Sequence, residues 1–392
     1  MNVMNKGTLL QPITRAEFEQ RRKALGQRVK AAGLSGAVAF GRQGTASTRA
    51  GYVLYLSDYY TPFFDGLEDC EPHWAGLGHA AVVTAPSGES LLVTDMNHYY
   101  FPGERPKEAG IGVVHDTNIM RGIATAAKKL GIGKGNVGLI GQEILSVKRY
   151  AQLQAAMPGM SLIWNDDLLD IDMMIKSEAE LRILRYANKA VEDIATQALR
   201  KARPGITEHE LVDFGRRAIA EAGGELFWMR PIRLLPLKDG DIYYMSIVAS
   251  FRGYFVDVAR NCVVGNAGPE KRGLVTYLND YILAQAHELK PGVTAEKAAE
   301  FGYRYFAGPK SNLTRAQIEE GVLCPFPAFG HSIGLTFGRP YIREGDKTVL
   351  KPGMVIAIEA NYELPNIGVA EAEVTVEIAE GGPRLLSGLA QG

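Results

Sequence analysis

Leu350-Lys-Pro-Gly-Met-Val-Ile-Ala-Ile-Glu359 predicts a tight turn followed by an apolar strand that reaches a carboxylate. The chain carries an earlier version of this pattern, Leu237-Lys-Asp-Gly-Asp-Ile-Tyr-Tyr-Met-Ser246, in which a serine takes the place of the carboxylate. A second motif is repeated too, since Pro204-Gly-Ile-Thr207 precedes the first copy and Pro291-Gly-Val-Thr294 precedes the second. Each copy therefore contains helix, turn, helix, turn and antiparallel strands, and this duplication predicts a pseudo-twofold α+β unit.

The strands that follow the two LKxG turns are expected to form one curved sheet, with helices covering its outer face. Ser246 and Glu359 occupy equivalent positions on these strands and point to the same face, because side chains alternate with a period of two. A site on the inner face would therefore take residues from both copies.

Upstream of the duplication, residues 1–170 alternate predicted helices and strands, which indicates an α/β domain. Its first helix is expected from Arg15 to Ala32, with Thr14 as the N-cap. The other predicted elements are strands at Gly36–Phe40, Gly51–Ser57, His79–Thr84, Ser90–Thr94 and Val137–Ile140, and helices near Ile119–Leu130 and Val147–Ala156. A second domain, residues 171–392, opens with the capping boxes Ser177-x-x-Glu180 and Thr207-x-x-Glu210.

Bulk properties exclude several classes of protein. The formal net charge of −1 gives no overall field that would attract nucleic acid or anionic lipid. We find no run of apolar residues long enough for a membrane span, and the N-terminal segment lacks the apolar core of a secretion signal. The three cysteines fit no zinc or redox motif. We therefore expect a cytoplasmic protein that acts on a small molecule and has no nucleic-acid or membrane partner.

Carboxylates and one histidine mark the strands of the duplicated half. Glu359 ends an apolar strand, so its charge must be paired, protonated or bound to a metal ion. Asp257 lies on the partner strand of the first copy, where an ion pair with Arg260 is the alternative to a functional role. Glu371 and Glu373 share one face of the corresponding strand in the second copy, so the pattern alone does not decide which of them reaches the site.

His331 lies in Gly330-His-Ser-Ile-Gly334, where the glycines indicate a tight backbone that holds an imidazole at a sheet edge. Three carboxylates and one imidazole on facing strands suit Mn, Fe(II), Co or Zn in a reactive site rather than a structural zinc.

Four motifs in the second domain resemble the pita-bread metallopeptidase superfamily, family M24, which includes methionine aminopeptidase, aminopeptidase P, prolidase, creatinase and ectoine hydrolase. They are GD…GYxxDxxR (Gly240 to Arg260), GHxIGL (Gly330 to Leu335), LxPGMVxxIE (Leu350 to Glu359) and the late strand glutamate around Glu373. The likeness covers nearly the whole chain. It implies a creatinase-type α/β domain over residues 1–170, a pita-bread α+β catalytic domain over residues 171–392, and a homodimer.

The resemblance also implies a set of metal ligands and one departure from it. Members usually bind two metal ions through Asp, Asp, His, Glu and Glu, and Asp257, His331, Glu359 and Glu373 match the last four positions. The first Asp is replaced by Ser246, a poor ligand that adds no charge. Because the missing Asp serves mainly the metal without the histidine, we expect one divalent metal (Mn, Fe, Co or Zn), with a metal-free site as the alternative.

Two histidines that usually bind the scissile amide are also replaced. Met229 or Arg230 takes the place of the first, and no histidine occurs in Thr336–Pro340 where the second is expected. These losses favour a creatinase-like or ectoine-hydrolase-like enzyme that cleaves an amide, amidine or urea-type C–N bond in a small polar, carboxylate-bearing substrate. The alternatives are an Xaa-Pro aminopeptidase or dipeptidase, a lyase on the same scaffold, and a catalytically degenerate binding protein.

In the hydrolase hypothesis, the predicted catalytic residues are His331, Glu359 and Glu373, and a metal ion would polarise the carbonyl and activate water. Glu359 or Glu373 would transfer the proton. The predicted substrate-binding residues are Arg230, Arg233, Arg339 and Tyr254. The arginines suit a forked contact with a substrate carboxylate, and surface charge is the alternative for each of them.

Overall fold

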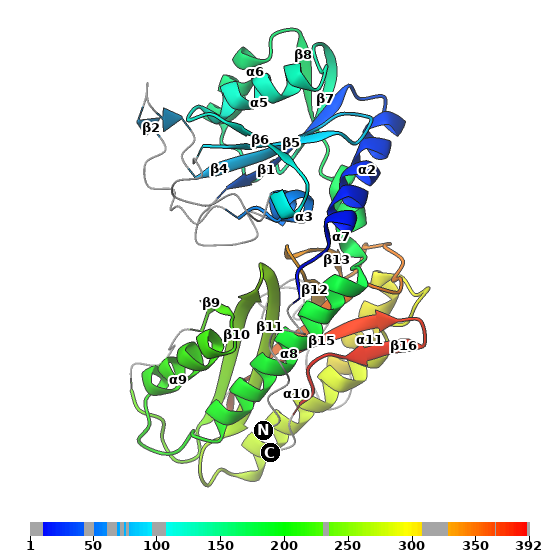
Figure 1. Ribbon diagram of the computed structural model, residues 1–392. Helices are drawn as coiled ribbons and strands as arrows, with labels where there is room; N and C mark the ends of the chain where they lie inside the picture. Colours follow the sequence, from blue (N-terminus) through cyan, green and yellow to red (C-terminus); the bar gives the residue numbers. More distant parts are fainter. Residues whose placement is uncertain are drawn as a thin grey trace. The chain divides into compact units, whose positions relative to one another are not determined.

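The computed structural model describes residues 11–42, 51–60, 69–70, 74–75, 78–95, 107–229, 235–307, 328–364 and 366–389. It divides the chain into two compact units, one made of Pro12–Met173 and one that includes Met174–Gly392 (Figure 1). No helix in these described ranges is long and apolar enough to cross a bilayer.

The first unit is built on a mixed sheet with the strand order β6-β5-β4-β1-β7-β8. The bounds of these strands are β1 Gly36–Arg42, β4 His79–Thr84, β5 Ser90–Thr94, β6 Gly112–His115, β7 Gly135–Ile140 and β8 Met160–Trp164. The helices are α2 Arg15–Ala31, α3 Gly51–Ser57, α5 Ile119–Lys129, α6 Val147–Ala156 and α7 Asp167–Met174, and a short ladder joins β2 Asp69–Cys70 to β3 Trp74–Ala75. The predicted α/β class of this unit is confirmed.

Two local predictions for the first unit are confirmed and one is wrong. Thr14 caps α2 as expected, since its side chain accepts a hydrogen bond from the Glu17 backbone. The strands β4 and β5 have the predicted bounds and pair antiparallel. The expected strand at Gly51–Ser57 is wrong, because this segment is the helix α3. The run is apolar and almost entirely buried, and such a short run has the same pattern in a buried strand and a buried helix.

The second unit contains two antiparallel sheets, in the orders β11-β10-β9 and β13-β12-β14-β15-β16. The strands are β9 Glu225–Trp228, β10 Ile242–Phe251, β11 Tyr254–Val263, β12 Gly330–Ser332, β13 Gly338–Tyr341, β14 Val355–Leu364, β15 Gly368–Ala379 and β16 Gly382–Leu385. The helices are α8 Glu178–Leu199, α9 Glu208–Glu221, α10 Pro269–His287 and α11 Ala295–Phe306. In Figure 1, α8 runs along β10 and β11. The helix α10 packs on β14 and β15.

The internal repeat is visible in the turns of the second unit. Gly205 donates its N–H to the carbonyl of Leu237 over 2.8 Å, and Gly292 donates in the same way to Leu350 over 2.9 Å. The two glycines have φ angles of +89° and +87°, which side chains with a Cβ rarely adopt. Each Pro-Gly turn is therefore joined to the LKxG turn of its own copy by the same backbone contact.

One curved hydrogen-bonded sheet was expected, but among the residues that the structure describes the two sheets are not joined by a ladder. The strands β11 and β15 lie side by side, and side chains bridge them. Arg260 donates to the carbonyl of Glu373, and Asn261 donates to the carbonyl of Glu371 over 2.9 Å. These contacts satisfy carbonyls of β15 that a ladder would otherwise have used.

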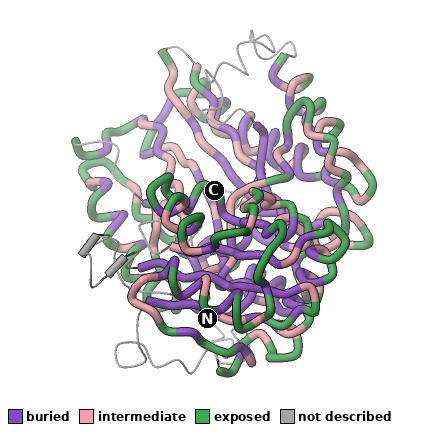
Figure 2. The backbone as a smooth tube through the Cα atoms, turned by 90° about the horizontal axis from the view of Figure 1, so that it is seen from above, coloured by how far each residue is buried: buried purple, intermediate pink, exposed green. Residues whose placement is uncertain are grey.

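The helices α10 and α11 cover one face of the larger sheet. Every second residue of β14 and β15 lies in the apolar core on that face: Ile356, Ile358, Ala360, Tyr362, Ala370, Ala372, Val374, Val376 and Ile378. Figure 2 shows how buried residues gather along the strands while exposed ones lie on helix surfaces and turns. Because side chains alternate along a strand, Glu359, Glu371 and Glu373 point to the opposite face.

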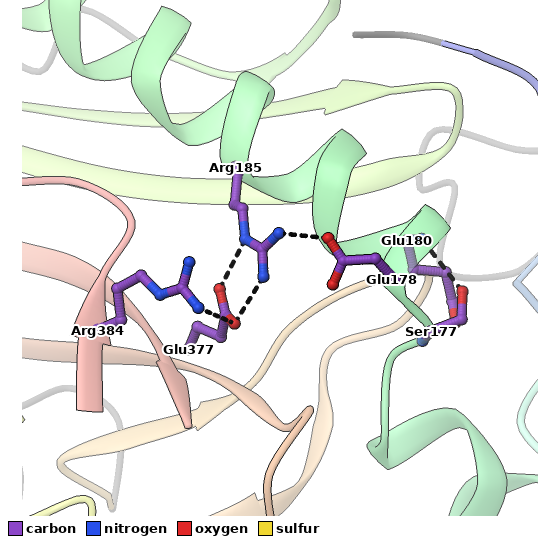
Figure 3. Close-up of polar contacts among 6 residues, drawn as sticks. All are labelled: Ser177, Glu178, Glu180, Arg185, Glu377 and Arg384. Carbon is purple, nitrogen blue, oxygen red and sulfur yellow. Dashed lines mark hydrogen bonds and ion pairs between the residues drawn. The ribbon is translucent and has the colours of Figure 1, made fainter. Parts of the chain in front are cut away.

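An ion-pair network attaches α8 to the strand that carries these glutamates (Figure 3). Arg185 of α8 makes two hydrogen bonds, of 2.8 and 2.9 Å, to the carboxylate of Glu377 on β15. Arg384 of β16 adds a third contact of 3.1 Å, and Glu178 binds Arg185 over 2.6 Å. The Glu377 side chain is only 3% exposed, so these arginines are needed to offset the cost of burying its negative charge.

We expect Arg185→Ala to lower the free energy of unfolding by about 2 kcal/mol, because it removes a forked partner from a buried carboxylate. Arg384→Ala is the matched control. Its side chain is 53% exposed, and the loss should stay below about 1 kcal/mol. Urea unfolding of the three proteins measures both values, and equal effects would contradict the assigned role of Arg185.

Candidate active site

Four strands of the second unit bring polar side chains to one place. One possible ligand atom from each of Asp257, His331 and Glu373 lies within 4.8 Å of the others. Oε1 of Glu359 lies 4.0 Å from Nε2 of His331. The ladder explains this grouping, because Glu359 is paired with Glu373 and His331 is paired with Ala357, two residues before Glu359.

The imidazole of His331 is buried and held in one orientation. Its Nδ1 lies 3.1 Å from the carbonyl oxygen of Ser332. A carbonyl only accepts hydrogen bonds, so Nδ1 carries the hydrogen of this contact, and Nε2 is the ring nitrogen that faces the carboxylate of Glu359. Gly330 is needed here, since a Cβ at this position would collide with the carbonyl oxygen of Ala357 on the adjacent strand.

Lys176 supports the same segment and was not found from the sequence. Its ammonium donates to Oγ of Ser332 and to the carbonyl of Met174, each over 3.2 Å. Burial lowers the pKa of Lys176 to about 8, and the negative charge of Glu180 opposes this effect. A signal was present, because a lysine directly before the N-cap Ser177 is unfavourable for the helix dipole and implies a tertiary partner.

The carboxylates of the site are enclosed and repel one another. Burial raises the pKa of Asp257 and, more strongly, that of Glu373, and the two groups share a hydrogen bond. Burial, followed by the charges of Asp257 and Glu371, raises the pKa of Glu359 to about 8. The pKa of Glu371 rises to about 7 for the first two of these reasons, although a hydrogen bond with Ser246 opposes the rise.

These residues fit a divalent metal ion. Oε1 of Glu359 and Oε1 of Glu373 are buried and have no hydrogen-bond partner in the structure. Leaving a carboxylate oxygen in this state costs free energy, which a bound cation would offset. The donor set of carboxylate oxygens and one imidazole nitrogen suits Mn, Fe(II), Co or Zn.

The face that carries the cluster is partly open. On β10, the residues Tyr244, Ser246 and Val248 are half-buried, whereas Met245 and Ile247 between them are buried. This face of β10 is therefore more accessible to solvent than the face that packs in the core.

The choice between the two late glutamates is now clear in geometric terms. Glu373 joins Asp257 and His331 in the cluster. Glu371 is not one of these three residues, although it shares a strand face with Glu373 and its pKa is raised by burial and by the charge of Asp257. Both glutamates therefore belong to the site region.

Two other sequence expectations have a different outcome. Arg260 binds the carbonyls of Ala259, Glu373 and Gly388 rather than the carboxylate of Asp257, because residues 257 and 260 point to opposite faces of β11. Tyr254, an expected substrate-binding residue, is 2% exposed and donates its hydroxyl to Glu180 of α8 over 3.0 Å.

These contacts do not fit the expected substrate-binding role of Tyr254. Its side chain instead packs α8 on β11, on the face away from the cluster. Arg339 is exposed on β13, and its positive charge helps to lower the pKa of Asp346. Arg230 and Arg233 lie outside the described residues.

Comparison with known proteins agrees with this architecture. The profile of metallopeptidase family M24 matches residues 229–380. The uncharacterized peptidase YqhT of Bacillus subtilis is 23% identical over 79% of this chain and 88% of that protein. An Xaa-Pro dipeptidase of Pyrococcus horikoshii is 25% identical over 57% of this chain and 65% of that protein. The dipeptidase PepE structure from Mycobacterium ulcerans has a TM-score of 0.76 at 22% identity, covering 96% of this chain and 97% of that one.

A duplicated α+β unit that carries a cluster of carboxylates and one histidine, preceded by an α/β unit, is the pita-bread architecture. Metal dependence is typical of enzymes with this architecture. Residues 229–380 match the M24 metallopeptidase family, and the relatives of the chain include dipeptidases. The fold expected from the motifs is thereby confirmed, and the match supports the expected superfamily over this part of the chain.

The raised carboxyl pKa values predict how the stability of the metal-free protein depends on pH. The folded state holds protons on Glu359 and Glu371 that the unfolded chain releases near pH 4.5, so stability falls as pH rises from about 5 to 8. We expect the melting temperature in EDTA to be lower at pH 8 than at pH 6. The variant Glu359→Gln should show a smaller fall in melting temperature between pH 6 and pH 8, because its amide stays neutral.

Glu363→Gln is the matched control, because Glu363 is exposed on the same strand. This variant should keep the wild-type pH dependence. A melting temperature that rises between pH 6 and 8 in the metal-free wild type would contradict the assignment of protonated carboxylates.

Proposed function

We propose that this hydrolase is a metal-dependent dipeptidase whose substrates are Xaa-Pro dipeptides. The observation that carries the proposal is the mutual approach of Asp257, His331 and Glu373 to within 4.8 Å, with unpartnered carboxylate oxygens beside them. The relative from Pyrococcus horikoshii is an Xaa-Pro dipeptidase. This support favours the dipeptidase alternative over the creatinase-like substrate that the missing histidines led us to expect.

A divalent cation at Asp257, His331, Glu359 and Glu373 would supply Lewis acidity to the scissile carbonyl. Glu359 is the carboxylate best placed to move the proton, since its side chain keeps 14% exposure while Glu373 is 1% exposed. It would take a proton from the attacking water and return it to the leaving nitrogen, so that one acid and one amine are released. His331 would bind the cation through Nε2, because Nδ1 donates to the carbonyl of Ser332.

A second candidate is a hydrolase of a non-peptide C–N bond in a small carboxylate-bearing molecule. Two observations favour it. Ser246 leaves the usual ligand set incomplete, and Met229, near the position of a family histidine, is 4% exposed. Its side chain packs against α9, where a Cβ on Gly215 would collide with it. A buried methionine cannot bind a scissile amide in the way a histidine does.

The domain assignment belongs to the same proposal. Residues 1–170 would form the creatinase-type domain and residues 171–392 the catalytic domain, and the division between compact units after Met173 supports a boundary near this point. The expected homodimer, the cytoplasmic location and the roles of Arg230, Arg233 and Arg339 stay predictions.

Hydrolysis of a panel of Xaa-Pro dipeptides by protein loaded with Mn or Co tests the proposal. We expect turnover by the wild type and a loss of kcat of at least about 100-fold in Glu359→Gln, because the proton carrier is removed. The exposed Glu363→Gln variant should retain wild-type turnover.

Creatine and an Nα-acetylated basic amino acid complete the panel. Hydrolysis of either compound, with every Xaa-Pro dipeptide left intact, would replace the proposal with the second candidate. No turnover of any compound by metal-loaded wild type would contradict both.

A further inference from the structure

Lys176 lies directly before Ser177, the N-cap of α8, and contacts both the GHxIGL motif and the LxPGM turn. All three segments belong to the second compact unit. Only 7% of the lysine surface is exposed. An ammonium group is buried to this extent only where hydrogen bonds replace its water, so the partners of Lys176 indicate its role.

The side chain of Lys176 ends at the segment that carries His331. Its Nζ donates to Oγ of Ser332 and to the carbonyl of Met174, each over 3.2 Å. The carbonyl oxygen of the same serine lies 3.1 Å from Nδ1 of His331. Ser332 therefore joins the ammonium to the imidazole, the first through its hydroxyl and the second through its carbonyl.

Two motif glycines make room for this lysine. A Cβ on Gly334 of the GHxIGL motif would lie 2.9 Å from Cε of Lys176. A Cβ on Gly353 of the LxPGM turn would lie 3.2 Å from the backbone oxygen of Lys176. The N–H of Lys176 also donates to the carbonyl of Gly353 over 2.8 Å. The turn that starts β14 and the segment around β12 are therefore packed against the same residue.

The strand that carries Asp257 reaches the same place. Phe255 of β11 donates its backbone N–H to the carbonyl of Gly334 over 2.7 Å. Three segments, each with a different candidate ligand, are thus connected at Lys176: β11 to the GHxIGL motif, and this motif and the start of β14 to the lysine itself.

The strand ladder leaves the peptide after His331 incompletely held. On the side of β13 the pairing shifts register between His331 and Ser332. Such an irregularity disrupts the backbone hydrogen bonds locally. A contact from outside the sheet is therefore needed at Ser332, and the ammonium of Lys176 provides it.

We propose that Lys176 is a positioning residue of the candidate active site, which holds Ser332 so that its carbonyl fixes the ring of His331 with Nε2 toward the carboxylates. The inference rests on the proposed metal-dependent function. Lys176 acts through Ser332 and is not itself a ligand, because a protonated amine has no electron pair to donate. A fixed imidazole binds a metal ion more tightly, since less freedom of rotation is lost on binding.

Mn²⁺ binding by the full-length protein tests the inference without any substrate. Metal-free wild type and Lys176→Met would be titrated with Mn²⁺ by calorimetry, because methionine fills similar space without donating a hydrogen bond. We expect the dissociation constant to rise about 10-fold at unchanged stoichiometry, since groups that orient a metal-binding histidine have effects of this size. A lysine with a solely structural role would lower the unfolding temperature and leave this constant unchanged, which would overturn the proposal.

Ser332→Ala removes the same hydrogen bond from its other side and reports on it even if Lys176→Met does not fold. It should also weaken Mn²⁺ binding. The double variant should bind Mn²⁺ no more weakly than Lys176→Met, because the two changes remove one shared contact. Losses that add up in the double variant would contradict the proposed connection.

Lys189→Met is the matched control, because the Lys189 side chain is 62% exposed on α8. This variant should bind Mn²⁺ as the wild type does. A loss equal to that of Lys176→Met would show that any lysine of this region has the same effect, and the specific role of Lys176 would be wrong.

Nitrogen-15 NMR of the metal-free protein separates this inference from the proposed function. The neutral ring of His331, identified by its absence from His331→Asn, should carry its hydrogen on Nδ1 in the wild type. Lys176→Met should give a mixture of the two tautomers. An unchanged tautomer would overturn the role of Lys176 and leave the proposed function intact. If the wild type binds no Mn²⁺, the metal-dependent function fails, and the tautomer comparison still decides the role of Lys176.

Discussion

Enclosure of several carboxylates on one sheet face is the constraint on which the second unit depends. Asp257, Glu359 and Glu373 lie close together in a buried place, and burial is the main cause that raises their pKa values. The neighbouring negative charges raise the pKa values of the two glutamates further, so bringing these groups together costs free energy. The opposite face of β14 and β15 supplies the compensating free energy. Its alternate residues form an apolar core with α10 and α11, and the Arg185–Glu377 network attaches α8 to the same strand.

The junction between the two sheets determines which side chains meet. Because β11 and β15 are bridged by Arg260 and Asn261 rather than by a ladder, their side chains can approach across the junction while the backbone carbonyls remain satisfied. Asp257 of one copy thereby reaches Glu373 of the other. The imidazole is fixed separately by its own backbone, through the contact of Nδ1 with Ser332 and the close strand pairing that Gly330 permits.

Features that depend on local chemistry or on the repeat could be predicted from the sequence. The capping boxes, the Pro-Gly turns and the equivalence of Ser246 with Glu359 follow from spacing, and the motifs indicated the superfamily. Features that depend on tertiary contacts could not be predicted in this way. The neighbour against which each segment packs decides these features. They are the helix at Gly51–Ser57, the junction of two sheets and the direction of the Tyr254 side chain toward α8. The strand pattern placed Glu371 and Glu373 on one face but could not assign their partners.

The replacement of an expected aspartate by Ser246 shows why an isolated motif position is a weak guide to chemistry. A metal ion requires oxygen atoms at given distances, and it is indifferent to the strand that provides them. On a duplicated sheet, carboxylates of both copies can meet across the junction of the two sheets, as Asp257 of β11 and Glu373 of β15 do in this chain. The loss of one aspartate from the first copy therefore leaves a cluster of two carboxylates and one imidazole intact, because its members come from three other strands.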